Sequence, residues 1–541
     1  MSVRTEPQSF NPFTKRDSPT DLLSTFINAK LVRINRATEE LEPWLAQRWT
    51  RSDDGTRYTV TLRPGVTFAD GHPFTADDVV FTFNVLYDER SRNVLADALR
   101  PGGQPLTVSA IDSHTVVITF PEPFAPGLRL LDILPILPRH RLEAAFRAGT
   151  FADAWGLGTP LDRITGLGPF TLAEYVPGQR TVLTKNPRYF RRDERGVALP
   201  YLDRVTIEIV TDQNAELLRL EAGDLDLTAS EVRPEDFAPL RRAAEGGRAQ
   251  LFDLGVGYDV NGFWINLTPG GLAGSGTGGR PAAPDRREAW VQRTELRHAI
   301  SLAVNRQAFA DAVYLGAGEP VFGPVTAANR KWFSTAVPQT PHDPAQAQAL
   351  LASIGLVDRN GDRLLDDPEG KTARLTMLTQ KGRTALERGA AVIRDEVAKL
   401  GLTIDVVTLD GAALIQRFLS ARDFDAVYFS VLMSSTDPAL NGDFWMSTGY
   451  AHVWRLHQRT PATSWEREID ELMKRQMRSF DETERKAAFD RVQALFAEQL
   501  PMVHFVAPKV FAAASARVTN LTPALSRPQL LWSPDTIAVT H

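Results

Sequence analysis

The segment "YTVTLRPGVTFADGHPFTADDVVFTFN" (residues 58–84) carries the clearest structural signal in the chain. Its first part alternates apolar and polar residues and then turns at Arg63-Pro64-Gly65 and at Asp70-Gly71, which predicts a β-hairpin. Its second part predicts a helix, because Thr75 is a good N-cap and two carboxylates follow in the first turn, where they suit the helix dipole. A strand, tight turns and a capped helix are therefore expected in close succession.

Length and composition limit the classes of protein that the chain can belong to. With 541 residues it is too long for one hydrophobic core, so two lobes or more are expected. The formal net charge of −5 gives no polycationic signature for nucleic acid, and we expect no nucleic-acid partner. The absence of cysteine excludes disulfides, thiolate metal sites and a cysteine nucleophile.

Strands and helices alternate along most of the sequence. The predicted strands and helices of the first half lie at residues 57–71, 73–89, 114–120, 168–190, 203–210 and 212–227. Those of the second half lie at 262–267, 294–314, 373–380, 385–401, 402–409, 424–432, 464–480 and 481–499. The pattern predicts a two-lobed α/β protein with a break near residues 251–261.

The sequence lacks the targeting and spanning signals of a membrane protein. It has no run of about 18 apolar residues, and its start, "MSVRTEPQSFNPF", has no apolar core of a signal peptide. We expect either a cytosolic protein or one whose signal has been removed.

The stretch "VYFSVLMSSTDPALNGDFW" (residues 427–445) joins an apolar run to a group of small polar side chains. The run predicts a buried strand, and Ser434, Ser435, Thr436 and Asp437 follow at its carboxyl end. Polar side chains in that position can either bind a ligand or take part in chemistry.

Motifs of known enzymes and cofactor sites are weak or missing. Gly274-x-Gly276-x-x-Gly279 matches the dinucleotide fingerprint in letters only, since prolines flank it and no strand leads directly into it, so a loop is expected. No nucleophile elbow and no phosphate-binding loop occur, and the histidines do not cluster at zinc spacing. We expect no cofactor and no enzymatic activity.

The segment "DRNGDRLLDDPEG" (residues 358–370) has two interpretations. Five of its side chains fall at positions 1, 3, 5, 9 and 12 of a calcium-binding loop: Asp358, Asn360, Asp362, Asp366 and Glu369. The sixth position, which should be glycine for the sharp turn, is Arg363. The alternatives are an acidic surface turn, which we favour, and a calcium site.

Several blocks together resemble a known family, and they are spread in family order over nearly the whole chain. They are residues 58–84, "SFNPF" (9–13), "LVRINRATEELEPWLAQRW" (31–49), "TGLGPFTLAEYVPGQRTVLTKNPRYF" (165–190) and "LRHAISLAVNRQAFADAVYLGAGEPVFGPV" (296–325). In these blocks the chain resembles the extracytoplasmic solute-binding proteins of ABC importers, family 5, the group that binds peptides, nickel complexes and oligosaccharides.

The resemblance implies a two-lobed periplasmic-binding-protein fold with an extra subdomain in lobe I. Lobe I would comprise residues 1–255, with the inserted subdomain at about 38–164. Lobe II would comprise residues 256–505, and residues 506–541 would return to lobe I. Hinge closure of the lobes around a ligand is the expected movement.

The resemblance also implies the ligand-binding residues. In lobe I they are the turn Arg16, Asp17 and Ser18, and Gly166 in the "TGLG" turn. On the strand after the crossover they are Tyr258, Asn261 and Trp264, and in the loop after the later strand they are Ser434, Thr436, Asp437 and Trp445. Peptide-binding members carry at the position of Ser434 an aspartate that pairs with the ligand's α-ammonium, so a free peptide is disfavoured here unless Asp437 substitutes.

The implied function is that of the extracytoplasmic, periplasmic binding component of an ABC importer, for an oligopeptide or a similarly large polar solute. Its expected partners are the solute and the permease and ATPase subunits of the importer, and the expected state is a monomer. The alternatives are an oligosaccharide, an opine-like compound or a metal chelate as the ligand, and a hydrolase or sensory module that reuses the fold.

Overall fold

The computed structural model describes the chain except for residues 16, 269–284, 432–435 and 541. The chain divides into two units. Unit 1 comprises Met1–Leu254 and Val510–His541, and unit 2 comprises Gly255–Lys509. Both boundaries fall inside strands, β11 (Ala249–Val256) and β18 (Val506–Ser515), so the chain passes between the units in extended conformation.

Unit 1 contains a four-stranded sheet in the order β1-β10-β9-β8. Its strands are β1 (Ser2–Val3), β8 (Phe170–Val176), β9 (Arg180–Lys185) and β10 (Arg204–Ile209). The first pair is parallel and the other pairs are antiparallel. The helices that flank these strands in sequence are α1 (Ser18–Ile27), α4 (Gln213–Ala222) and α5 (Phe237–Glu245), and a short pair is formed by β19 (Val518–Thr519) and β20 (Ala538–Val539).

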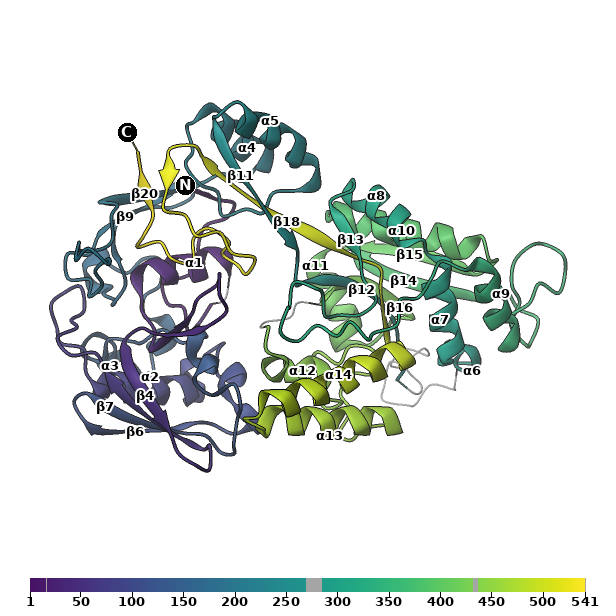
Figure 1. Ribbon diagram of the computed structural model, residues 1–541, viewed down its shortest axis with the longest axis horizontal. Helices are drawn as coiled ribbons and strands as arrows, with labels where there is room; N and C mark the ends of the chain where they lie inside the picture. Colours follow the sequence, from purple (N-terminus) through teal and green to yellow (C-terminus); the bar gives the residue numbers. More distant parts are fainter. Residues whose placement is uncertain (16, 269–284, 432–435, 541) are drawn as a thin grey trace. The chain divides into compact units, whose positions relative to one another are not determined.

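The first residues of the segment 58–84 lie in strand β5 of a second sheet of unit 1, which has the order β4-β5-β7-β6; Figure 1 labels β4, β6 and β7 of this sheet. These antiparallel strands are β4 (Ala46–Arg51), β5 (Arg57–Leu62), β6 (Thr107–Asp112) and β7 (Thr115–Thr119), with β2 (Val32–Ile34) and β3 (Leu41–Pro43) as a separate hairpin. The predicted helix is confirmed as α2 (Ala76–Tyr87), with Thr75 and Asp78 in a capping box, and α3 (Arg139–Arg147) packs near it.

The predicted hairpin of this segment is wrong in its pairing. Strand β5 pairs with β4 and β7, which come before and after it in the sequence. The residues that follow Gly65 form a smaller hairpin of their own, in which Phe68 N donates to His72 O (2.8 Å) and Phe74 N donates to Val66 O (3.0 Å). Alternation predicted the strand, but its partners are the preceding strand β4 and the more distant strand β7, and not the residues that follow Gly65.

Unit 2 is built on a five-stranded mixed sheet in the order β15-β14-β16-β12-β17. The strands are β12 (Val260–Ile265), β14 (Arg374–Gln380), β15 (Thr403–Leu409), β16 (Ala426–Val431) and β17 (Met502–His504), and β13 (Gly318–Pro320) pairs with β18. Its helices are α6 (Glu288–Val291), α7 (Thr294–Ala303), α8 (Arg306–Tyr314), α9 (Pro344–Ser353), α10 (Thr384–Ala398), α11 (Gly411–Ile415), α12 (Gly442–Trp445), α13 (Ser464–Arg478) and α14 (Glu482–Gln499).

The single helix predicted for residues 294–314 is two helices in the structure. Helix α7 ends at Ala303, and Asn305 caps α8 by accepting a hydrogen bond from Ala308 N (3.0 Å). The apolar spacing continues through the break because both helices bury one face in the same core, so periodicity alone does not reveal it.

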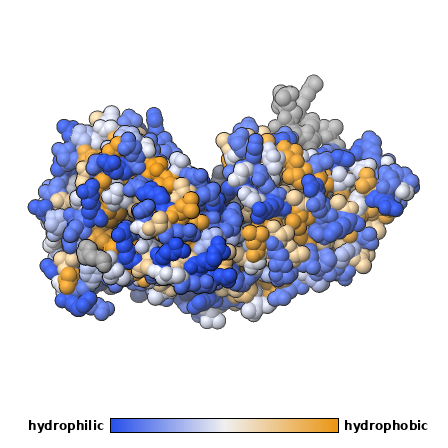
Figure 2. All heavy atoms as spheres, turned by 90° about the horizontal axis from the view of Figure 1, so that it is seen from above, coloured by the Kyte–Doolittle hydropathy of each residue, from blue (hydrophilic) through white to orange (hydrophobic). Residues whose placement is uncertain are grey.

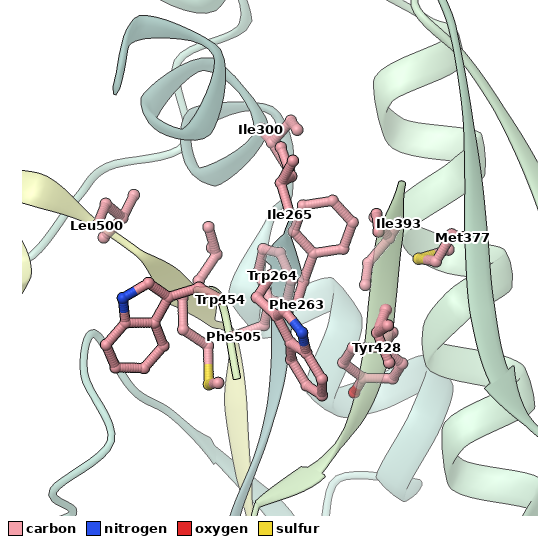
Figure 3. Packing of buried hydrophobic residues seen from close by; sticks show 14 of the residues in the cluster. Phe263, Trp264, Ile265, Ile300, Met377, Ile393, Tyr428, Trp454, Leu500 and Phe505 are labelled. Atoms are coloured by element: carbon pink, nitrogen blue, oxygen red, sulfur yellow. The ribbon is translucent and has the colours of Figure 1, made fainter. Parts of the chain in front are cut away.

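The core of unit 2 forms around β12. Phe263, Trp264 and Ile265 are at most 1% exposed and pack with residues of the neighbouring strands and helices (Figure 3). On the face shown in Figure 2, hydrophilic residues cover most of the surface, with apolar residues between them. Among the described residues, no helix is both long and apolar enough to cross a bilayer.

Candidate functional site

A pocket with an empty volume of about 330 Å³ lies in unit 2. Four segments that are distant in sequence line it: the turn just before β12, the turn after β13, the loop and short helix after β16, and helix α14. Its lining residues are Tyr258, Pro324, Val325, Thr326, Asn329, Thr436, Pro438, Asn441, Trp445 and Phe489.

The loop after β16 is shaped by local capping. Asp437 accepts a hydrogen bond from Ala439 N (3.0 Å) and caps the 3-10 turn Pro438–Asn441, with proline at its first position. Helix α12 follows directly and places Trp445 in the pocket wall. An aspartate N-cap followed by proline is a common way to start a helical turn, so these residues hold the wall in place.

The carboxylate of Asp437 is neutralised inside unit 2. Its Oδ1 accepts a hydrogen bond from Arg485 Nη2 at 2.6 Å, and both side chains are only 7% exposed. The guanidinium also donates to Gln476 O (2.9 Å) and lies over the ring of Trp332. This buried ion pair argues against Asp437 as the partner of a ligand ammonium, because the negative charge already has a fixed cation.

Among the residues that the structure describes, two in the pocket lining carry buried polar atoms without a hydrogen-bond partner. Asn329 donates from Nδ2 to Thr436 O (2.8 Å), but its Oδ1 accepts no hydrogen bond. The Nε1 atom of Trp445 is also buried without an acceptor. Since buried polar atoms normally have partners, the lining residues leave one acceptor and one donor for an occupant. Neither is charged, so a neutral amide or hydroxyl suits them.

The other residues predicted on β12 and near it have different surroundings. Tyr258 lines the pocket, whereas Asn261 donates from Nδ2 to the hydroxyl of Tyr314 (2.9 Å). Trp264 is 1% exposed and lies among the buried hydrophobic residues shown in Figure 3. It packs edge-on against Phe418 and is not part of the pocket lining. The pocket lining thus brings together Tyr258, Thr436 and Trp445 but does not include Trp264.

Of the residues predicted around the first turn of lobe I, Asp17 has a clear structural task. It is the N-cap of α1, accepting hydrogen bonds from Thr20 N (3.1 Å) and Thr20 Oγ1 (2.7 Å), and Ser18 is the first residue of that helix. Arg16 and Ser434 lie outside the described residues.

Gly166 lies against the end of α1, where there is no room for a side chain. A Cβ at this position would be 1.9 Å from the carbonyl oxygen of Ile27, and the nearby Gly168 N donates to the same oxygen at 3.0 Å. The "TGLG" turn is therefore glycine-rich because two backbone segments meet there.

The segment 358–370, for which the sequence favours an acidic surface turn over a calcium site, forms a compact turn. Asp358 accepts from Gly361 N (2.7 Å) and Arg363 N (3.0 Å), and Arg363 has φ +70°, which is the left-handed conformation expected of glycine. Asp366 is 2% exposed and accepts from Arg359 N (3.1 Å). In the part of the chain that the structure describes, no three histidine, cysteine or acidic side chains are grouped to hold a metal. The dinucleotide-like glycines lie in the undescribed range 269–284.

Several pocket residues could not be found from sequence motifs. Thr326, Asn329 and Phe489 come from segments without a motif of their own, and Asn441 lies in the quoted stretch 427–445 but was not among the residues predicted there. The only signal was indirect: the family-like block that ends at Val325 leads straight into the turn that carries Thr326 and Asn329.

Comparison with family models gives one match over most of the chain. Residues 40–451 match the model described as "Bacterial extracellular solute-binding proteins, family 5 Middle". Among curated proteins, a probable ABC transporter-binding protein of Deinococcus radiodurans is 27% identical over 98% of this chain and 91% of its own length. The oligopeptide-binding protein AppA of Bacillus subtilis is 25% identical over 93% of this chain and 84% of its own length. The periplasmic alpha-galactoside-binding protein of Rhizobium meliloti is 26% identical over 94% of this chain and 75% of its own length.

Solved structures of similar proteins confirm the predicted α/β, two-lobed periplasmic-binding-protein fold. The ABC transporter substrate-binding protein CtaP of Listeria monocytogenes has a TM-score of 0.78 at 22% identity, covering 100% of this chain and 98% of that one. AppA of Bacillus subtilis in complex with a nonapeptide has a TM-score of 0.74 at 23% identity, with the same coverage. NikA of Brucella suis in complex with Fe(III)-EDTA has a TM-score of 0.77 at 19% identity, covering 100% of both chains.

Proposed function

We propose that this chain, which belongs to the bacterial extracellular solute-binding proteins of family 5, is the binding component of an ABC importer for an oligopeptide or a similarly large polar solute. The relatives named as oligopeptide-, dipeptide- and di/tripeptide-binding proteins support this ligand class, since each is matched over most of this chain. The relative named for alpha-galactosides keeps an oligosaccharide as the second candidate.

The observation that carries the proposal is the chemistry of the pocket in unit 2. Its lining combines aromatic walls with one unpaired acceptor on Asn329 and one unpaired donor on Trp445. A peptide backbone unit is a secondary amide, so its N–H can donate to Asn329 Oδ1 and its carbonyl oxygen can accept from Trp445 Nε1. The charge of Asp437 is engaged by Arg485, so we propose that the solute is held here by neutral groups and not by an α-ammonium.

The remaining properties follow from this assignment. We propose that the protein works outside the cytoplasm, as a monomer, and delivers its solute to the permease and ATPase subunits of the importer without chemical change. Units 1 and 2 would be the two lobes of the fold. Neither nucleic acid nor a cofactor has a part in this function.

Thermal unfolding in the presence of matched solutes tests the proposal. A ligand at 100 times its dissociation constant stabilises the folded state by about 2.7 kcal/mol, which is readily measured as a rise in melting temperature. We expect peptides with free and N-acetylated amino termini to bind equally well, because the described lining of this pocket contains no carboxylate that could pair with the α-ammonium of the peptide. A response restricted to free peptides would refute the neutral binding mode, and conversion of the solute, followed by mass spectrometry, would refute the transport assignment.

Two tryptophans provide a matched pair of variants for the site. Trp445 and Trp264 both have a buried Nε1 without a partner, but only Trp445 lines the pocket. Trp445→Phe should lower the affinity for the solute by about two- to tenfold, which is the value of one hydrogen bond. Trp264→Phe should leave the affinity unchanged. Equal effects of the two variants on affinity would show that the pocket does not contact the solute.

A further inference from the structure

A second pocket, with an empty volume of about 290 Å³, lies entirely in unit 1 and is separate from the site described above. Helices α4 and α5, the segment between them and strand β18 enclose it; Figure 1 shows the two helices beside one another. Its lining residues are Gln213, Glu216, Leu217, Leu220, Thr228, Ser230, Glu231, Val232, Asp236, Leu240 and Ala513.

Glu216 is the unusual member of this lining. The residue is 2% exposed, and its Oε1 accepts hydrogen bonds from Ser2 Oγ (2.7 Å) and Thr228 Oγ1 (3.2 Å). Its Oε2 is equally buried but accepts none, and within the described ranges Glu216 forms no ion pair. A carboxylate buried beside hydroxyls alone is costly, because a buried charge needs an opposite charge nearby.

The other acidic groups of the pocket already have their cations. Asp236 is paired with Arg233 at 2.7 Å, and Glu231 is paired with Arg527 at 2.6 Å. Gln213 uses its side chain to accept from Arg4 (3.1 Å) and to donate to Glu231 O (2.7 Å). Glu216 is thus the acid whose charge the surrounding residues do not compensate.

Part of the pocket lining is aliphatic. Leu220, Leu240 and Ala513 form a small core cluster, against which Leu217 and Val232 pack. A carboxylate oxygen without a donor next to aliphatic side chains is complementary to an ammonium group on a short alkyl chain. A metal ion fits less well, since no suitable group of three ligands occurs among the described residues.

We propose that this pocket is a binding site for a primary alkylammonium ion, whose ammonium group donates to Glu216 Oε2 and whose alkyl chain packs on the leucines. The inference is independent of the solute proposed for unit 2, since the two pockets share no residue.

Calorimetric titration with three small probes tests the chemistry. We expect n-butylammonium to bind, n-butanol to give no binding because it lacks the charge, and ammonium chloride to bind more weakly because it lacks the alkyl chain. Equal binding of n-butylammonium and n-butanol would overturn the role of the carboxylate, and absence of any n-butylammonium binding would overturn the site.

Variants of one helix locate the site. Glu216→Gln keeps the shape but removes the charge, and it should weaken n-butylammonium binding by at least about tenfold. Glu221→Gln, a half-buried residue of the same helix outside the pocket lining, is the matched control and should bind as the unchanged protein does. Leu217→Trp should weaken binding by filling the pocket while Glu216 stays intact, which keeps the test decisive if Glu216→Gln fails to fold. Unchanged binding in Leu217→Trp would place the ion elsewhere.

Discussion

Replacing Asp437 by asparagine tests whether this residue holds unit 2 together or holds the solute. Asparagine can still accept the hydrogen bond from Ala439 N that starts the 3-10 turn, so the main loss is the negative charge. Arg485, whose side chain is 7% exposed, would then remain buried without its counter-ion. Removing one partner of a buried ion pair costs about 3–5 kcal/mol, and we expect Asp437→Asn to lower the free energy of unfolding by that amount.

The assay is urea denaturation followed by tryptophan fluorescence, with an exposed ion pair as the control. Arg491 and Glu468 are 2.9 Å apart but 45% and 46% exposed, so Glu468→Gln should cost no more than ~1 kcal/mol. The double variant Asp437→Asn/Arg485→Met should recover much of the loss, because it leaves no buried charge. If Asp437→Asn costs as little as Glu468→Gln and instead abolishes solute binding, the carboxylate faces the ligand and our reasoning is wrong.

Three further predictions concern pH, packing and specificity. Burial opposes the charge of Glu466, but its hydrogen bond with His452 and the charge of a neighbouring arginine outweigh burial and lower the pKa of Glu466 to about 2. The ionised side chain should therefore contribute ~3 kcal/mol to the free energy of unfolding above pH 4.5, and this contribution should be lost as the pH falls toward 2. Glu466→Gln should remove this pH dependence in calorimetric scans. Gly166→Ala should destabilise unit 1 at the upper end of the ~1–3 kcal/mol range for overpacking, because the new Cβ would clash with a backbone carbonyl. The control Gly158→Ala should leave the stability unchanged in the same scans, because its Cβ would have open space. Ser434→Asp should raise the affinity for peptides with a free amino terminus over their acetylated forms in titration calorimetry; no change would show that the anchor position is misplaced.

Local signals predicted the individual elements of the fold well. Capping residues and turn residues marked α2 and the start of α4 at Asp212, because these contacts are made between residues close in sequence. Periodicity could not separate α7 from α8, nor assign the partners of β5, because the neighbouring elements decide both.

The residues of the site were harder to predict than the elements. Aromatic side chains at strand ends were candidates for a pocket wall, but Trp445 and Trp264 look alike in sequence. Both are buried in the core of unit 2, and only the packing shows that Trp445 also lines the pocket whereas Trp264 does not. Asn329 had only the indirect signal of the neighbouring family-like block, since its side chain matters only where the turn after β13 meets the loop after β16.

By itself, the sequence determined the α/β class, the need for more than one core and the family to which the chain belongs, since length, periodicity and ordered family blocks are properties of the linear chain. Only the tertiary structure decided what each polar side chain does. For Asp437, a candidate ligand anchor in the sequence, the fold places Arg485 Nη2 at 2.6 Å from the carboxylate, and no sequence pattern indicated this contact. The physical reason is that a buried charge is stable only beside an opposite charge, and the arginine that pairs with Asp437 lies on another helix, about fifty residues further along the chain.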